Sequence, residues 1–275
     1  MRSLALAGHS GGVAWTYVRV DGGWVWADDS GGDGPPLVLL HPGVGDSRFW
    51  DPVLPALTKA YRVISYDARG YGRSDAPKVE FSLLRDLVAV LDHYGLDRVA
   101  IVGCSQGGGS GLGLALEQPA RVSALVLLRP GIPGFPWPEE PESAEPDELE
   151  AEYERALAAG DVDALAGVMQ RVWAAAGPTP AVMEQLRSAA RAEIASGDLQ
   201  QQDPPVFDRL GELSVPVSLL VGDADYPPLV EADKQAAARI PGCELTIVAG
   251  MDHMPALREP ALVLRTITDT LARVR

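Results

Sequence analysis

Short apolar runs recur along the chain, and longer segments of mixed polarity separate them. The runs are four or five residues long and mostly apolar, a pattern typical of parallel strands that are covered on both faces. They lie at residues 37–40, 63–66, 99–102, 125–128, 217–221 and 245–248. Residues 13–20 and 24–27 are instead rich in β-branched and aromatic side chains, and the Asp-Gly-Gly sequence between them favours a turn. These two ranges therefore predict an opening β-hairpin.

Between the apolar runs, apolar side chains recur at the spacing of an amphipathic helix. Residues 83–91 show this spacing, and Gly95 follows at the position of a helix C-cap. A second helix is expected to begin near Gln106, and residues 264–271 predict a last one. Alternating strands and helices predict an α/β fold with a mostly parallel, doubly wound sheet and helices on both faces.

The alternation stops within residues 131–205. A stretch rich in proline and glutamate, residues 133–141, leads into three segments with helical spacing and no predicted strand. Their apolar faces carry Leu149, Tyr153 and Leu157, then Val162, Leu165, Met169 and Val172, then Val182, Leu186 and Ala190. We expect residues 131–205 to be a helical cap inserted into an α/β core of residues 1–130 and 206–275. The insertion follows the carboxyl end of a strand, where open α/β sheets bind ligands, so a cap there would cover the site.

The composition is that of a globular protein with an acidic surface. Hydrophobic residues make up 47% and charged residues 22% of the 275 residues, enough to build a core without a metal or a disulfide. The 23 basic and 38 acidic side chains give a formal net charge of −15. Such a charge repels phosphate backbones and anionic lipids, so we expect neither a nucleic-acid nor a membrane partner.

Cysteine usage and the apolar segments indicate a soluble cytoplasmic protein. Cys104 and Cys243 are too few and too far apart for a disulfide framework or a Cys-x-x-Cys metal pair. The apolar stretch at residues 4–7 is shorter than the roughly seven residues or more of a signal-peptide core. Every apolar segment is also interrupted before the roughly 18 residues expected of a membrane span.

Residues 103–107, Gly-Cys-Ser-Gln-Gly, carry the strongest chemical signal in the sequence. They match the pattern G-x-S-x-G, directly after a predicted buried strand and directly before a predicted helix, which is the context of a nucleophile on a sharp turn. Small residues are needed at Gly103 and Gly107, because the strained turn leaves no room for side chains there. Ser105 is therefore the candidate nucleophile.

Two alternative interpretations of this segment fit less well. The glycines within residues 107–113 suggest a glycine-rich phosphate loop, but the chain has no Gly-Lys dipeptide, which a P-loop needs. The segment that begins Gly70-x-Gly72 has Asp75 where a dinucleotide-binding motif needs its third glycine. Cys104 is a second conceivable nucleophile, although neighbouring side chains diverge at a sharp turn and a small buried cysteine is commonly packing.

A serine nucleophile needs a base, and four histidines compete for that role. His9 lies near the amino terminus, His93 near a predicted helix end, and His41 at a strand end where it could shape the adjacent loop. His253 lies in residues 250–255, between the last predicted strand and the last predicted helix. It is the candidate base, because loops after strands meet at the functional edge of the sheet.

Two aspartates at the end of the run 217–221 could orient this base. Asp225 is preferred over Asp223. The resulting chain order of serine, aspartate and histidine is the order found in the α/β-hydrolases, and it differs from the orders of chymotrypsin-like and subtilisin-like enzymes.

With these residues in place, the chain resembles the α/β-hydrolase-fold enzymes, and specifically the capped group of small-molecule esterases, lactonases, carbon–carbon bond hydrolases and cofactor-free haloperoxidases. Residues 103–107 carry the resemblance, together with residues 67–74, which are similar to a D-x-R-G-x-G-x-S loop of the family, and residues 41–44, which correspond to its H-G-x loop. The 67–74 segment is usually structural in the family and fixes a turn near the site.

The resemblance also implies two donors for an oxyanion hole. They are the backbone amides of Gly43 and Gln106. Pro42 departs from the family pattern, which has glycine there, but the donor belongs to the next residue, so the hole can survive.

The resemblance implies a serine hydrolase that cleaves a carboxylic ester or lactone of a small, partly apolar molecule through an acyl-enzyme. No cofactor or metal is required for this chemistry. Candidate residues for the substrate pocket are Phe135, Trp137, Met169 and Trp173. A carbon–carbon bond hydrolase or a cofactor-free perhydrolase would use the same triad, and a hydrolase-like protein that only binds a small molecule is an alternative of another class.

Overall fold

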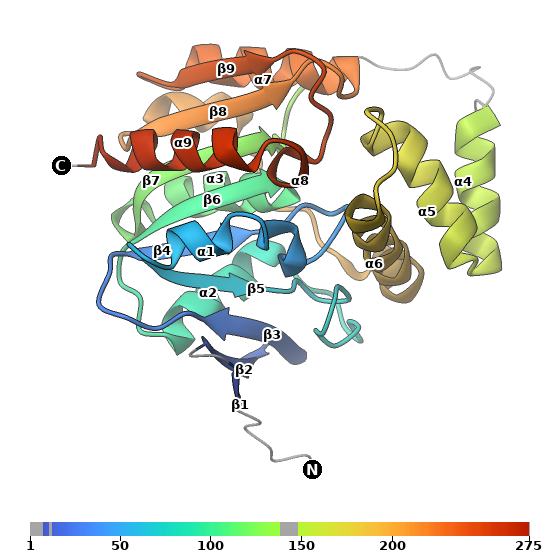
Figure 1. The fold of residues 1–275 in the computed structure, drawn as a ribbon, viewed down its shortest axis with the longest axis horizontal. Helices are drawn as coiled ribbons and strands as arrows, with labels where there is room; N and C mark the ends of the chain where they lie inside the picture. The colour runs from blue at the N-terminus through green and yellow to red at the C-terminus, as the bar shows by residue number, and fades with distance from the viewer. Residues whose placement is uncertain (1–7, 11–12, 138–147, 275) are drawn as a thin grey trace.

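The computed structural model describes residues 8–10, 13–137 and 148–274. The apolar stretch at residues 4–7 and residues 138–147 of the expected cap lie outside these described residues. Within the described ranges, nine strands form one sheet in the order β1-β2-β3-β5-β4-β6-β7-β8-β9 (Figure 1). The strands are β1 (Gly8–Ser10), β2 (Val13–Val20), β3 (Gly23–Asp29), β4 (Pro36–Leu40), β5 (Arg62–Tyr66), β6 (Val99–Ser105), β7 (Val122–Pro130), β8 (Val217–Gly222) and β9 (Glu244–Val248).

The sheet is antiparallel at one end and parallel elsewhere. Strands β1, β2, β3 and β5 pair antiparallel, whereas β5, β4, β6, β7, β8 and β9 pair parallel. The predicted opening hairpin is confirmed, because Val20 pairs with Gly23 across a two-residue turn in which Gly22 has φ +73°. The mostly parallel sheet predicted from the alternation is confirmed as well.

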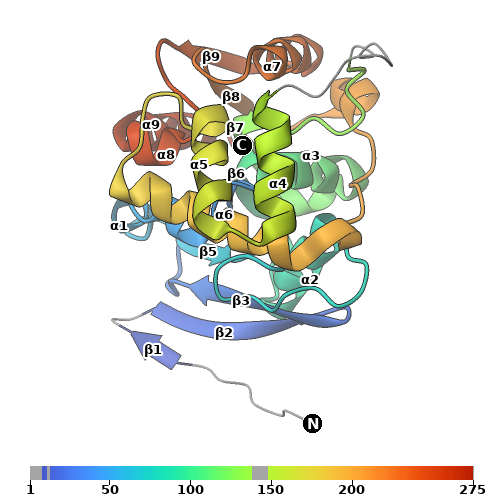
Figure 2. The same ribbon diagram turned by 90° about the vertical axis from the view of Figure 1, so that its right-hand side faces the viewer.

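Helices cover both faces of the sheet (Figures 1 and 2). They are α1 (Leu54–Leu57), α2 (Leu83–His93), α3 (Gln106–Glu117), α4 (Glu148–Ala159), α5 (Val162–Trp173), α6 (Pro180–Ser196), α7 (Pro227–Arg239), α8 (Pro255–Arg258) and α9 (Pro260–Leu271), with 3₁₀ turns η1 (Ser47–Trp50), η2 (Pro119–Arg121), η3 (Gly197–Leu199) and η4 (Phe207–Glu212). Residues of α2, α3 and α7 pack in one hydrophobic cluster, and residues of α1, α8 and α9 pack in the other.

The continuous apolar runs follow from this two-sided packing. In β4, Val38 and Leu40 belong to the cluster on one face, while Leu37 and Leu39 belong to the cluster on the other. Successive side chains of a strand point to opposite faces, so a strand covered on both sides needs apolar residues at every position. The sheet thus forms the centre of a three-layer core.

Strand β9 is an exception to the predicted burial. Its apolar run predicts a strand covered on both faces, but Leu245 and Ile247 are 36% and 45% exposed. The strand itself is confirmed, but the prediction that both of its faces are buried is wrong. In the described sheet, β9 is the last strand and pairs only with β8.

Helices α4, α5 and α6 lie between β7 and β8 in the chain and gather beyond the carboxyl ends of the parallel strands (Figures 1 and 2). We call them the helical insertion. The chain returns to the sheet close to where it left, since the Val206 and Phe207 amides both donate to the Pro133 carbonyl, at 2.8 and 3.2 Å. No helix in the described part of the chain is long and apolar enough to cross a membrane.

Candidate active site

Ser105 lies at the junction of β6 and α3, in a backbone conformation that residues other than glycine rarely adopt. Its φ is +50° and its ψ is −120°. A Cβ on Gly103 would come within 2.6 Å of the Gly107 carbonyl oxygen, and a Cβ on Gly107 within 2.5 Å of the Leu40 carbonyl oxygen. Both positions therefore require glycine, as the sequence pattern predicts for a serine held on a sharp turn.

His253 and Asp225 form a buried pair at the same edge of the sheet. Asp225 lies in the turn between β8 and α7, and His253 in the loop between β9 and α8. The His253 Nδ1–H donates to Asp225 Oδ2 at 2.6 Å, and the two side chains are 1% and 0% exposed. With Nδ1 protonated, the neutral imidazole has its lone pair on Nε2, the arrangement that a general base needs.

The surroundings of this pair favour a neutral histidine and an ionised aspartate. Burial lowers the pKa of His253 below its ordinary value, although the hydrogen bond to Asp225 opposes the shift. Burial alone would raise the pKa of Asp225, but the hydrogen bond from His253 and the nearby Arg129 charge hold it below its ordinary value. Both charge states are those that proton abstraction from a serine requires.

Ser105 and His253 line the same cavity, and so do Gly43 and Gln106. Gln106 is the first residue of α3, and the first amides of a helix have no acceptor within the helix. The preceding loop is fixed by His41, whose Nδ1 lies 2.8 Å from the Pro42 carbonyl oxygen and whose Nε2 accepts from the Ala68 amide at 2.9 Å. His41 thus shapes the loop that carries Gly43.

Comparison with known proteins bears on the fold. Residues 35–159 match the family model of the alpha/beta hydrolase fold. The putative carbamate hydrolase RutD of Variovorax paradoxus (strain S110) is 48% identical over 97 residues, which cover 33% of this chain and 36% of that protein. The match thus spans about a third of the length of this curated relative.

Solved structures match over nearly the whole chain. Carboxylesterase CesB (YbfK) from Bacillus subtilis superposes with a TM-score of 0.76 at 23% identity, covering 94% of this chain and 90% of that one. Est816, described as an N-acyl homoserine lactone degrading enzyme, superposes with a TM-score of 0.74 at 26% identity, covering 92% and 99%. The chain therefore has the α/β-hydrolase fold.

In this α/β-hydrolase-fold protein, residues 67–74 form a tightly bonded turn beside the site. Asp67 accepts from the backbone amides of Ser47 and Arg73, at 2.9 and 2.8 Å. Arg69 forms a buried two-pronged ion pair with Asp86, with both distances at 2.7 Å. The turn presents Tyr71 to the cavity.

Arg129 is a residue of the site that the sequence analysis missed. It lies at the carboxyl end of β7, 3% exposed, with its Nε 3.0 Å from Asp225 Oδ2. Its φ is +46°, and Ser105 is the other non-glycine residue with positive φ in the described ranges. This conformation costs about 1–2 kcal/mol for an L-residue. An arginine at the end of an apolar strand was the signal available in the sequence.

The cavity that holds Ser105 has a volume of about 620 Å³ and extends under the helical insertion. Of the four predicted pocket residues, Met169 and Trp173 line it. The Trp173 ring lies 4.8 Å from the His253 ring, and the Trp173 carbonyl accepts from the His253 amide. The end of α5 is therefore joined directly to the candidate base.

The structure does not bring Phe135 and Trp137 to this cavity. The Phe135 ring packs against Phe207 and Trp137, with centroids 5.0 and 4.7 Å away, and Trp137 is 46% exposed. The two rings lie just after β7, beside η4, because the hydrogen bonds from residues 206–207 to the Pro133 carbonyl hold this segment there.

The sequence analysis also missed the polar lining of the cavity. Tyrosines and glutamates from helices α4 and α6 and from two loops contribute to it, namely Tyr71, Tyr153, Tyr226, Glu150 and Glu193. The Tyr153 hydroxyl donates to the Glu193 carboxylate. None of the described residues that line the cavity is a lysine or an arginine, so the wall facing Ser105 is acidic and aromatic.

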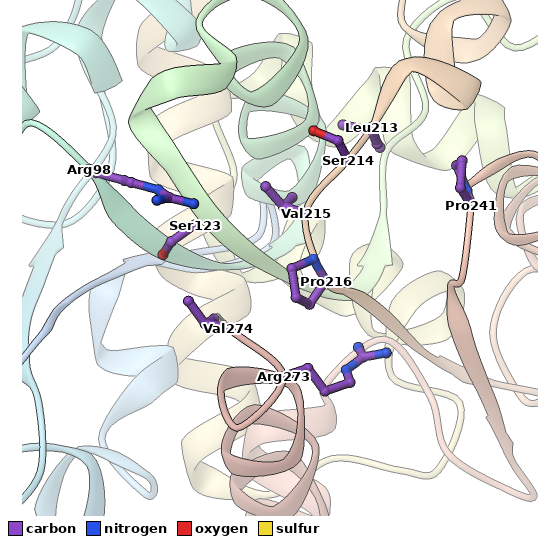
Figure 3. A pocket seen from close by; sticks show the side chains of 9 residues that line it. All are labelled: Arg98, Ser123, Leu213, Ser214, Val215, Pro216, Pro241, Arg273 and Val274. Carbon is purple, nitrogen blue, oxygen red and sulfur yellow. The ribbon is translucent and has the colours of Figure 1, made fainter.

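A second hollow, of about 440 Å³, lies at the opposite edge of the sheet (Figure 3). It is lined by residues that begin or precede strands, including Ser123 and Pro216, and by Arg98, Arg273 and Val274. Its described lining contains no histidine to activate Ser123. Among the residues that the structure describes, no group of three or more histidine, cysteine, aspartate or glutamate side chains is placed to hold a metal.

Proposed function

We propose that this protein is a serine hydrolase that cleaves a carboxylic ester or lactone of a small, partly apolar molecule. One observation carries the proposal: a serine on a strained strand-to-helix turn shares a cavity with a buried histidine whose Nδ1 is bonded to an ionised aspartate. These three groups are the nucleophile, base and orienting acid of an acyl-transfer site.

In the first half of the proposed reaction, the Ser105 hydroxyl oxygen attacks the substrate carbonyl carbon, and His253 Nε2 takes the hydroxyl proton. Asp225 stabilises the imidazolium that results. The amides of Gly43 and Gln106 donate to the carbonyl oxygen as it becomes negatively charged, and each such donor contributes on the order of 3 kcal/mol to barrier lowering. His253 then returns the proton to the leaving alcohol oxygen as the ester bond breaks.

In the second half, a water molecule attacks the acyl-enzyme carbonyl while His253 takes one of its protons. The tetrahedral intermediate collapses, the bond to Ser105 breaks, and His253 returns the proton to the serine oxygen. The products are a carboxylic acid and an alcohol, or one hydroxy acid from a lactone. All steps use groups of this chain and water.

A carbamate is a second candidate substrate, because a segment of the chain is 48% identical to a protein named as a putative carbamate hydrolase. Its carbonyl can be attacked by Ser105 in the same way. Esters and lactones come first, since the solved structures described as a carboxylesterase and a lactone-degrading enzyme match over more than nine-tenths of the chain.

The test of the proposal is labelling by a fluorophosphonate, a reagent that phosphonylates activated serines. Intact-mass analysis is expected to show one adduct on the wild type and none on folded Ser105→Ala or His253→Ala. Sustained hydrolysis of nitrophenyl esters, lactones or carbamates beyond one equivalent would then distinguish an enzyme from a protein that only binds. An unlabelled wild type, or a Ser105→Ala variant with wild-type turnover, would refute the proposal.

A further inference from the structure

A buried arginine lies against the candidate orienting aspartate. Arg129 Nε is 3.0 Å from Asp225 Oδ2, the same oxygen that accepts from His253 Nδ1. Arg129 Nε also lies 3.9 Å from Oδ2 of Asp233, on α7. Arg129 and Asp233 are 3% and 1% exposed, so solvent and salt screen these contacts only weakly. A permanent positive charge is therefore held beside the Asp225–His253 pair.

The backbone is distorted at the residue that supplies this charge. Cys104 of β6 pairs with Leu128 of β7, and Ser105 pairs with Pro130, so Arg129 is an extra residue in the ladder. Such bulges redirect side chains beside active sites. The positive φ of Arg129 fits this reading, because arginine has none of the freedom of glycine in that region. The register shift thus lies beside both Ser105 and Arg129.

The second carboxylate near Arg129 is poorly satisfied. In the described part of the chain, neither oxygen of Asp233 has a hydrogen-bond partner. Nε and Nη2 of Arg129 have none either, so the 3.0 Å contact of Nε with Asp225 is an ion pair without a hydrogen bond. Burial raises the pKa of Asp233 to about 8, against the opposing effect of Arg129. Asp233 therefore carries a proton over much of the neutral range, and the Arg129 charge is then left to act mainly on Asp225.

We propose that Arg129 is a positioning residue for the Asp225–His253 pair: its charge holds the Asp225 carboxylate ionised and aimed at His253, and it keeps the resting imidazole unprotonated. This inference rests on the proposed function. Arg129 lowers the pKa of Asp225 and that of His253. Other ionisable groups near the pair are Asp252, which is paired with Arg258 at 2.8 Å, Asp233 and the buried Cys104 thiol. The cavity wall that His253 shares adds the side chains of Tyr71, Glu150, Tyr153, Glu193 and Tyr226.

Two measurements test the proposal. The pH titration of the His253 imidazole by NMR needs no substrate, and its signal is assigned by its loss in His253→Gln, since the chain has four histidines. The rate of fluorophosphonate labelling against pH reports the reactivity of Ser105. In Arg129→Met, which keeps a similar volume without the charge, we expect the titration of His253 to move to higher pH and the labelling rate at neutral pH to fall about tenfold or more.

Two further variants separate this role from simple loss of stability. Arg129→Lys keeps a charge and is expected to titrate much closer to the wild type than Arg129→Met. The double variant Arg129→Met/Asp233→Asn replaces a side chain that is already protonated at neutral pH once Arg129 is gone, so its His253 titration is expected to stay shifted as in Arg129→Met. Arg69→Met, which breaks the buried pair with Asp86, is the matched control and is expected to leave that titration unchanged.

The proposal would be overturned if the folded Arg129→Met variant, or the folded double variant, had the same His253 titration and the same labelling rate as the wild type. So would identical titrations in the Met and Lys variants. If the wild type is not labelled at all, the proposed function fails, and the NMR titration still decides whether Arg129 acts on His253.

Discussion

Ser188 and Asp46 form a buried hydrogen bond that joins the helical insertion to the core. The Ser188 hydroxyl, on α6, donates to Asp46 Oδ2 at 2.6 Å. Asp46 also accepts from the Arg48 amide and guanidinium, and its own amide donates to the Gln185 side chain at 2.9 Å. One carboxylate thus caps η1 and anchors α6 over the cavity.

Replacing Asp46 with asparagine is expected to lower the free energy of unfolding by about 2 kcal/mol at neutral pH, because hydrogen bonds to a buried charge are lost. Urea denaturation measures the change. Asp163→Asn is the control, since Asp163 pairs with Arg187 at the surface with a 79% exposed side chain, where ion pairs contribute little to stability. Equal effects of the two substitutions would show that Asp46 is not the anchor.

The effect of Asp46 should depend on pH. Burial alone would raise the pKa of Asp46, but hydrogen bonds from Arg48 and Ser188 hold it well below its ordinary value. A carboxylate with a depressed pKa stabilises the fold above its unfolded pKa, about 3.9, and that contribution is lost as the pH falls through the folded pKa. The difference in unfolding free energy between wild type and Asp46→Asn should therefore be constant near neutral pH and shrink below about pH 4.

The two candidate orienting aspartates should differ sharply. Asp225→Asn is expected to lower kcat on a nitrophenyl ester by about four orders of magnitude, because asparagine favours the wrong histidine tautomer. Asp223 is exposed and accepts from the Gly250 amide at 2.7 Å, so Asp223→Asn is the matched control and should keep kcat within about twofold. A large loss in the Asp223 variant with full activity in the Asp225 variant would reverse the assignment.

The parts of the molecule that the sequence predicted are those set by local pattern. The turn at Ser105 needs small residues at fixed offsets between a strand and a helix, and Gly103 and Gly107 satisfy that need within five residues of chain. Apolar runs and helical periodicity likewise report on one element at a time.

The parts that the sequence analysis missed depend on how distant elements meet. Arg129 reaches Asp225 and Asp233 only through a bulge and the placement of α7. The burial of β9 depends on strand order, because the same apolar run would be covered if another strand followed it. Which aromatic residues face the cavity depends on the orientation of the insertion, so Trp173 reaches it and Trp137 does not.

Glycine substitutions should separate the turn from an ordinary helix position. In Gly107→Ala the new Cβ would meet the Leu40 carbonyl oxygen at 2.5 Å, so we expect a loss of about 1–3 kcal/mol in unfolding free energy together with loss of labelling. Gly167 lies within α5, and a Cβ there meets nothing within 4 Å. Gly167→Ala should instead gain about 0.5–1 kcal/mol. Thermal or urea unfolding measures both, and a stable, fully labelled Gly107→Ala protein would contradict the tight turn.

The acidic wall of the cavity should make hydrolysis sensitive to substrate charge. Glu193 lines the cavity and no described lysine or arginine does, so a cationic substrate should be favoured and an anionic one disfavoured. Unit charges about 4 Å apart interact by about 1 kcal/mol even in water, which corresponds to roughly fivefold in rate. We expect kcat/KM to decrease from acetylcholine to 3,3-dimethylbutyl acetate, in which a neutral tert-butyl group replaces the trimethylammonium group. It should decrease again for an acetate ester that carries a sulfonate.

In Glu193→Gln this charge preference should shrink while hydrolysis of the uncharged ester changes little, because glutamine keeps the shape and can still accept from Tyr153. Glu184→Gln is the matched control, since Glu184 lies on the same helix but pairs with Arg48 at the surface, with its side chain 48% exposed. It should keep the full preference. A wild type that hydrolyses all three esters equally would show that the carboxylates do not select the substrate, because a field that acts on bound charge cannot leave the three rates the same.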